Sequence, residues 1–62
     1  MTHRIDNARC KIATEKACLI AWDDGEEWFP NSQIDDDSEV YSQGDEGTFI
    51  CSDWIAKQKG LD

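Results

Sequence analysis

The dipeptide Asp24-Gly25 constrains the fold of this chain more than any other feature, because it lies between two apolar segments. A dipeptide of this kind is the strongest short-range signal for a β-hairpin, here with a type I′ turn, which needs positive φ at both central residues. Residues 16–22 (KACLIAW) before it form an apolar run that predicts a buried strand. Residues 26–29 after it predict a second strand, which ends at Pro30 because proline cannot donate a ladder hydrogen bond.

Further strands are predicted on both sides of this hairpin. Residues 8–14 (ARCKIAT) alternate in the manner of a strand, and residues 48–51 (TFIC) are β-branched and aromatic. Residues 40–41 are expected to form another short strand. Residues 1–7 are expected to be a flexible start, and residues 35–38 are too acidic and polar to be buried.

A short helix is predicted at the C-terminal end. Ser52 is a candidate N-cap for a helix over residues 53–59, and Gly60 supplies its left-handed stop. A helix of about two turns is marginal alone, so Trp54 is expected to anchor it onto the sheet. One further helical turn is expected after Pro30, which would return Ile34 to the core.

These elements predict one α+β domain over residues 1–62. Its architecture is a small antiparallel sheet, or a partly open barrel, of four or five short strands with one C-terminal helix. A chain of this length buries only about 60% of the surface that it exposes when unfolded. The aromatic side chains must therefore supply much of the core, since each one buries roughly 150–250 Å².

Acidic residues dominate the charge of the chain. There are 14 Asp and Glu against six Lys and Arg, which gives a formal net charge of −8. Ten of these acids, with no base among them, are Asp23, Asp24, Glu26, Glu27, Asp35, Asp36, Asp37, Glu39, Asp45 and Glu46. Basic patches bind phosphates, so this excess argues against a nucleic-acid or anionic-membrane ligand and favours a basic protein partner. The simpler alternative is that the acids solvate loop tips and guard a sheet edge.

Metal, cofactor and catalytic chemistry find little support in the sequence. Cys10, Cys18 and Cys51 form no CxxC pair and are expected to be three free thiols. Zinc bound with His3, or a single disulfide, is the alternative. The acid clusters lack the order of an EF-hand loop, which disfavours calcium. Paired carboxylates need a cleft to become catalytic, so we expect no enzyme and no cofactor. No apolar run reaches the roughly 20 residues that span a bilayer, and we expect a soluble protein of the host cytoplasm.

Alternation in the second strand of the hairpin separates two aromatic rings. Glu27 and Phe29 share one face, whereas Glu26 and Trp28 share the other. Burial of one ring leaves the other exposed among carboxylates. Tight turns on both sides of this strand are expected to fold the acids at 23–27 beside those at 35–39, in one negative face. The predicted partner-binding residues are therefore Trp28 and the ten acids named above.

Two segments resemble known sequences. TEKACLIAWDDGEEWFPNSQI and the later GDEGTFICSDWIAKQKGL are similar to very small phage and prophage proteins, in which D-D-G-E-E-W-x-P-x-S-Q-I precedes a closing W-x-A-x-x-K-G-L helix. The resemblance covers most of the chain after Thr14. Cys18 and Cys51 depart from it, because an aliphatic residue is expected at both positions. Small size and strong acidity are also similar to anti-CRISPR proteins and other phage-encoded inhibitors, some of which imitate the charge of DNA.

Two functions follow from these observations. The first is an inhibitor whose DNA-mimicking acidic face binds a basic, nucleic-acid-binding host protein; the resemblance implies a CRISPR effector as that protein. The alternative is a small β-barrel adaptor that holds a peptide or nucleic-acid segment on exposed Trp28, Trp22 or Tyr41 during phage replication. A stacking platform for bases normally includes a positive groove. Only Arg4, Arg9, Lys11 and Lys16 could supply one.

Overall fold

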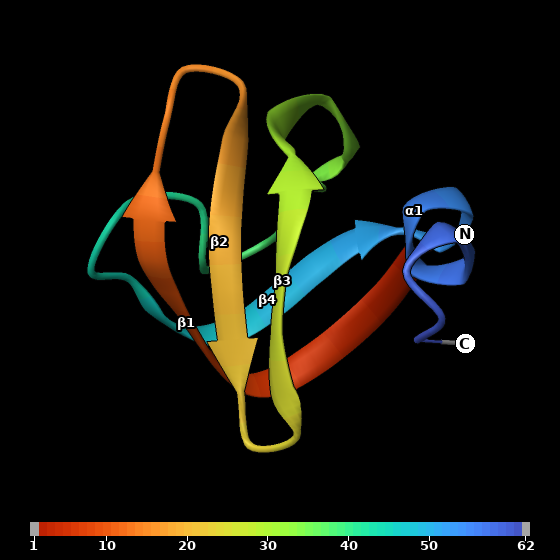
Figure 1. Ribbon diagram of the computed structural model, residues 1–62, viewed down its shortest axis with the longest axis horizontal. Coiled ribbons are helices and arrows are strands. Elements are labelled where there is room, and N and C mark those ends of the chain that lie inside the picture. Colours follow the sequence, from red (N-terminus) through yellow and green to blue (C-terminus); the bar gives the residue numbers. More distant parts are fainter. Residues whose placement is uncertain (1, 62) are drawn as a thin grey trace.

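The computed structural model describes residues 2–61 of the protein (Figure 1). In chain order the elements are β1 (Thr2–Ala13), β2 (Ala17–Trp22), β3 (Gly25–Pro30), the 3-10 turn η1 (Asn31–Gln33), β4 (Glu46–Ser52) and α1 (Asp53–Gln58). The four strands form one antiparallel sheet in the order β3-β2-β1-β4. The predicted α+β class, an antiparallel sheet with a short C-terminal helix, is confirmed for these residues.

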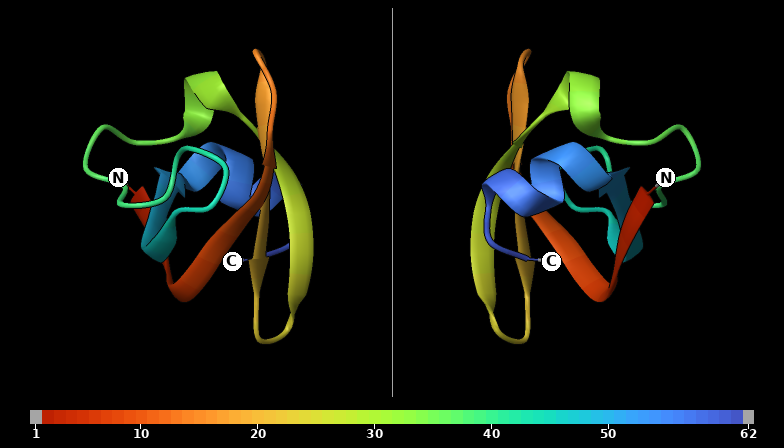
Figure 2. Two further views of the ribbon diagram at one scale, coloured as in Figure 1. Left: turned by 90° about the vertical axis from the view of Figure 1, so that its left-hand side faces the viewer. Right: turned by 90° about the vertical axis from the view of Figure 1, so that its right-hand side faces the viewer.

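Strand β1 is bent, and its two halves have different partners. Its residues 2–9 pair with β4, as in Ile5↔Phe49, while residues 9–13 pair with β2, as in Cys10↔Ile20, and the two pairings overlap at Arg9. The register with β4 shifts between Ile5 and Ala8, where Asn7 has φ 57°. Bulges of this kind bend a strand and increase its twist, and Figure 2 shows β1 as a V. The bend curls the sheet around its own core.

The predicted flexible start is wrong for residues 2–7, which form the first half of β1. These residues are mostly polar, so their own sequence gives little strand signal. Their order comes from pairing with β4, which extends from Thr2↔Ser52 to Ile5↔Phe49. Met1 lies outside the described residues.

The β2–β3 hairpin is confirmed, but its turn differs from the prediction. Trp22 pairs with Gly25, so Asp23 and Asp24 are the two central residues. Within residues 2–61 only Asn7, among the residues other than glycine, has a positive φ. The turn is therefore not of type I′, which would need positive φ at both aspartates. The predicted alternation holds, since Phe29 is fully buried and Trp28 is 40% exposed.

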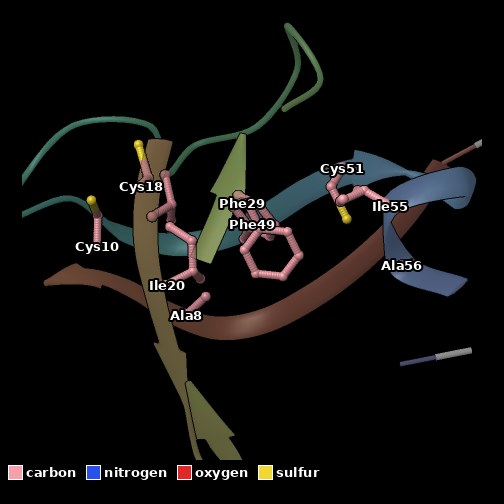
Figure 3. Packing of buried hydrophobic residues seen from close by; sticks show 10 residues of the cluster. Ala8, Cys10, Cys18, Ile20, Phe29, Phe49, Cys51, Ile55 and Ala56 are labelled. Atoms are coloured by element: carbon pink, nitrogen blue, oxygen red, sulfur yellow. The ribbon is translucent and has the colours of Figure 1, made fainter. Parts of the chain in front are cut away.

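Two phenylalanine rings, tilted by 50° relative to each other, form the centre of the core. The ring centroids of Phe29 on β3 and Phe49 on β4 lie 4.7 Å apart, although the two strands are at opposite edges of the sheet. The curled sheet makes this contact possible. Cys10 and Cys18 lie at one end of the core, and Cys51 lies near α1 at the other end (Figure 3). All three cysteines are buried and free.

Helix α1 begins and ends as predicted to within one residue, but its buried face is different. The Ser52 side chain accepts a hydrogen bond from the Ile55 amide at 3.2 Å, and Gly60 has φ 74°. The prediction that Trp54 packs inward is wrong, because Trp54 is 59% exposed. Ile55 and Ala56 are buried instead. Successive helical residues are about 100° apart around the axis, so a helix that buries positions 55 and 56 directs position 54 outward.

The segment between η1 and β4 runs along the outer edge of β4. Ile34 forms a bridge with Cys51, and the amides of Asp35 and Glu39 donate to the carbonyls of Ile50 and Thr48. Val40 is fully buried in this segment, although residues 40–41 are irregular rather than the predicted strand. The loop therefore covers an edge that would otherwise expose unpaired backbone groups.

Ser38 corrects the prediction that residues 35–38 all stay exposed, since it is only 4% exposed. Its hydroxyl donates to the Val40 carbonyl at 2.9 Å and accepts from the Ile50 amide at 3.0 Å. Burial of a hydroxyl costs little when it is hydrogen-bonded. Ser38 is thus buried because it lies against the edge of β4 and is hydrogen-bonded there.

Candidate functional site

The predicted acidic residues form two separate groups, not one face. The hairpin tip with Asp23 and Asp24 precedes β3, whereas Asp35, Asp36 and Asp37 follow η1 beyond the other end of that strand. Figure 1 shows the tip and η1 at opposite ends of β3. A six-residue strand is about 20 Å long. The expected meeting of these groups is therefore wrong, because an extended strand separates them.

Three of the predicted site residues stabilise the loop itself. Asp35 accepts a hydrogen bond from the Asp37 amide at 2.9 Å, and Glu39 accepts one from the Thr48 amide at 2.9 Å. Asp45 accepts from the amides of Tyr41 and Ser42 at 3.2 and 3.0 Å. Side chains of this kind pair backbone groups that turns leave free. For Glu39 and Asp45 this structural role accounts for an acidic residue at the position.

Two further predicted residues form ion pairs with basic side chains. Glu26 lies 3.0 Å from the Lys11 ammonium, and Glu27 lies 3.6 Å from that of Lys59. Glu27 also accepts from the Trp28 amide at 3.0 Å. Among residues 2–61, these are the two acids of the predicted set that have an ion pair. Asp23, Asp24, Asp36, Asp37 and Glu46 keep exposed carboxylates with no hydrogen-bonded or ionic partner in the described chain.

The first acidic group surrounds the hairpin tip. Asp23 and Glu46 line a small cleft together with Arg9 and Trp22. Glu46 pairs with Arg9 across the β1–β4 ladder, so one base lies among these acids. The tip is thus partly neutralised, which reduces its value as a site for a basic ligand.

The second acidic group surrounds a groove that has an aromatic wall. Asn31, Ile34, Asp35, Asp36 and Tyr41 line a groove of about 400 Å³. A second groove shares Ile34, Asp35 and Asp36 and reaches Ser52 on β4. The two aspartates therefore line both grooves. Tyr41 is 62% exposed and lines the same groove as the two aspartates.

This groove has the chemistry of a receptor for a cationic side chain. Carboxylates form charge-assisted hydrogen bonds with guanidinium and ammonium groups, and an aromatic face attracts the same cations. Asp35 and Asp36 were in the predicted set, whereas Tyr41 and Ile34 were not. Tyr41 was expected to be exposed only in the alternative function, the adaptor, and the polar residues that follow it, Ser42 and Gln43, are the sequence signal for that exposure.

Exposed apolar side chains mark a different part of the surface. Trp28 on β3 and Ile12 on β1 are 40% and 44% exposed, and both pair with Leu19 of β2 in the ladder. Trp54 on α1 is also exposed. Trp28 therefore lies beside apolar ladder neighbours, and its role as an anchor among the acids stays a prediction.

Comparisons of the chain with known protein families, with curated proteins and with solved structures gave no match. Within residues 2–61, no three His, Cys, Asp or Glu side chains gather in a metal-binding arrangement. The described helix is too short to cross a membrane.

Proposed function

We propose that this protein is a small acidic binding module that inhibits a basic, nucleic-acid-binding protein of the host cytoplasm. The observation that carries the proposal is the groove in which Asp35, Asp36 and Tyr41 surround one open space. A lysine or arginine from a phosphate-binding surface would find two carboxylates and a ring there. Such a contact would occupy a base that normally binds phosphate.

The separation of the acidic groups is compatible with imitation of a nucleic acid. Duplex DNA carries one negative charge per about 1.7 Å of axis, so a basic groove made for it extends over a long distance. Acidic sites at the two ends of β3, about 20 Å apart, would contact different parts of such a groove. The resemblance to small phage proteins makes a CRISPR effector the first target to test.

The proposal is tested by capture of binding proteins from a bacterial lysate on the immobilised chain. We expect captured proteins that are eluted by duplex DNA and by high salt, because ion pairs at an exposed interface are screened. Asp36→Asn and Tyr41→Ala should each reduce capture. Glu15→Gln is the matched control for the first variant, since it removes the same charge from an exposed residue at the β1–β2 turn.

Capture that resists both salt and DNA would contradict the proposal, as would equal capture by Asp36→Asn and wild type. Loss of capture in Glu15→Gln as well would show that net charge, not the groove, decides binding.

A second candidate function is favoured by the exposed rings. If the curled sheet works as a partly open barrel, Trp28 and its apolar neighbours could hold a peptide segment, as in an adaptor. Lys11 lies on the same part of β1 but is paired with Glu26, so a positive groove for stacked bases is not formed there. If this second function is correct, Trp28→Ala should abolish capture of binding proteins, whereas high salt should leave capture unchanged.

A further inference from the structure

The outer face of the sheet carries an apolar row that does not belong to the core. Ile12, Leu19 and Trp28 are aligned across β1, β2 and β3 by the ladder pairs Ile12↔Leu19 and Leu19↔Trp28. Side chains paired in this way point to the same face. Leu19 is only 8% exposed, yet it lies outside the core cluster. Its two ladder neighbours in the row are themselves exposed, at 44% for Ile12 and 40% for Trp28.

The charges of the residues beside this row sum to zero. The next row across the sheet reads Glu26, Ala21, Arg9 and Glu46, and Lys11 is ion-paired with Glu26. Two bases and two acids therefore flank the apolar row. Since the whole chain has six bases and 14 acids, the other four bases and 12 acids account for the entire net charge of −8.

From this charge distribution and the apolar row we infer that the outer face binds a second copy of this chain. Two molecules of charge −8 repel each other unless they meet where the local charge is balanced. The row of Ile12, Leu19 and Trp28 is such a place. A two-fold arrangement would set each copy's Arg9 and Lys11 near the other's Glu26 and Glu46, so the same patch is complementary to itself.

The exposed edge of β3 is unsuited to pairing with another strand, so a second copy would contact the outer face of the sheet and not its edge. Pro30 on β3 has no amide hydrogen, and the Trp28 amide is already bonded to the Glu27 carboxylate. Features of this kind prevent strands of two molecules from pairing edge to edge. Two sheets that pack face to face instead interdigitate side chains about 10 Å apart. Trp28 would be the central residue of that contact, as aromatic residues are in interfaces.

The patch has the size of a reversible interface. Burial of about 800 Å² per partner, typical of a stable complex, would take one fifth of the 4069 Å² surface of the chain. A face of three strands is only about 10 Å wide between its outer strand axes. We therefore expect a dimer whose population rises with concentration over the accessible range.

Sedimentation equilibrium over about a hundredfold range of concentration tests the inference, and in this range the mass should rise from 7.1 kDa toward twice that value. Trp28→Ser should weaken association at least about tenfold. Trp54→Ser is the matched control, because it removes a tryptophan that lies outside the patch and is more exposed than Trp28, 59% against 40%, and it should leave association unchanged. High salt should strengthen the dimer, because it screens the repulsion between two acidic molecules. Binding of a basic partner should show the opposite salt dependence, so the two proposals can fail separately.

A mass of 7.1 kDa at every concentration would overturn the inference. Equal weakening by the two tryptophan variants, or growth beyond a dimer, would also overturn it. If Trp28→Ser does not fold, the inference is tested with the variants Lys11→Glu and Lys57→Glu. Both reverse one exposed base and change the net charge equally, but only Lys11 flanks the patch, so Lys11→Glu should weaken the dimer more than Lys57→Glu does.

Discussion

At the scale of single residues, the six aromatic side chains form a buried group and an exposed group with different roles. Phe29 and Phe49 are fully buried and Trp22 packs against Phe29, at 6.4 Å between ring centroids. Trp28, Tyr41 and Trp54 are exposed. In a domain this small each buried ring is a large part of the core. Exposed rings contribute little to stability and are available for contacts.

Replacement of one aromatic residue from each group should show this difference. Phe29→Ala should lower the free energy of unfolding by about 3–5 kcal/mol, which is most of the stability expected for a chain of this length. Trp54→Ala should cost less than about 1 kcal/mol, because its ring is mostly in solvent. Urea unfolding followed by circular dichroism measures both values. Equal losses would refute the assignment of Trp54 to the surface.

The buried thiol of Cys51 should make stability depend on alkaline pH. Burial, together with the nearby charge of Asp53, raises the pKa of Cys51 from 9.0 to about 11. The folded state therefore holds this proton more tightly than the unfolded chain. The stabilisation is complete below pH 9 and is lost as pH rises through 11, by about 3 kcal/mol at most. Urea unfolding across this range should show the loss. Cys51→Ala should reduce it and leave the part due to Cys10, because burial also raises the pKa of Cys10 to about 11; an unchanged slope in that variant would contradict the assignment.

At the scale of elements, a loop without regular structure completes the sheet. The segment from Ile34 to Glu39 pairs with the free edge of β4 through one bridge and two backbone hydrogen bonds. Side chains supply the remaining partners, since Ser38 and Glu39 accept from the amides of Ile50 and Thr48. The same segment carries Asp35 and Asp36 to the groove. Stability of the edge and geometry of the groove are therefore linked.

Ser38→Ala tests this link. The substitution leaves the amide of Ile50 without its partner in a partly buried position, which should cost about 1–3 kcal/mol. It should also speed hydrogen exchange at residues 48–51 of β4, because the covering loop is loosened. Ser42→Ala, at an exposed position of the same loop, is the control and should change neither property. An unaffected exchange rate in Ser38→Ala would show that the backbone bonds alone hold the loop.

At the scale of the whole molecule, repulsion between the acidic residues opposes the stabilisation that the core supplies. The chain carries a net charge of −8 in a body only 25 × 24 × 18 Å in extent. Exposed carboxylates this close together repel, and the repulsion lowers stability. The outer-face row and the acidic groove are on opposite sides of β2, since Leu19 faces outward while the Cys18 thiol contacts the carbonyl of Tyr41 at 3.4 Å. A dimer through the outer face would thus leave both grooves open.

The repulsion predicts that salt stabilises the fold. The melting temperature should rise between about 0.05 and 0.5 M potassium chloride, as the screening length falls well below the size of the molecule. Asp36→Asn with Asp37→Asn should raise the melting temperature in low salt and reduce its dependence on salt. Lys57→Gln, which removes an exposed base, should lower it. A melting temperature independent of salt would mean that the acids are too well hydrated to repel.

The sequence alone was sufficient wherever neighbouring residues carry the physical signal. The hairpin around Asp24, the placement of Trp28 and Phe29 on opposite faces of their strand, and the Ser52 cap all depend on periodicity or on bonds within a few residues. The groups of acids could also be read directly, because charge is a property of composition.

Only the tertiary structure decided which distant segments meet. The order of residues 2–7 depends on pairing with β4, and the burial of Ser38 depends on the Ile50 amide. Trp54 points outward because Ile55 and Ala56 fit the core better than one large ring at the start of the helix. The groove needs Tyr41 beside Asp35 and Asp36, and the outer-face row needs three strands in register. Such contacts are chosen by packing of the whole chain, since no local pattern records which strand will lie beside which.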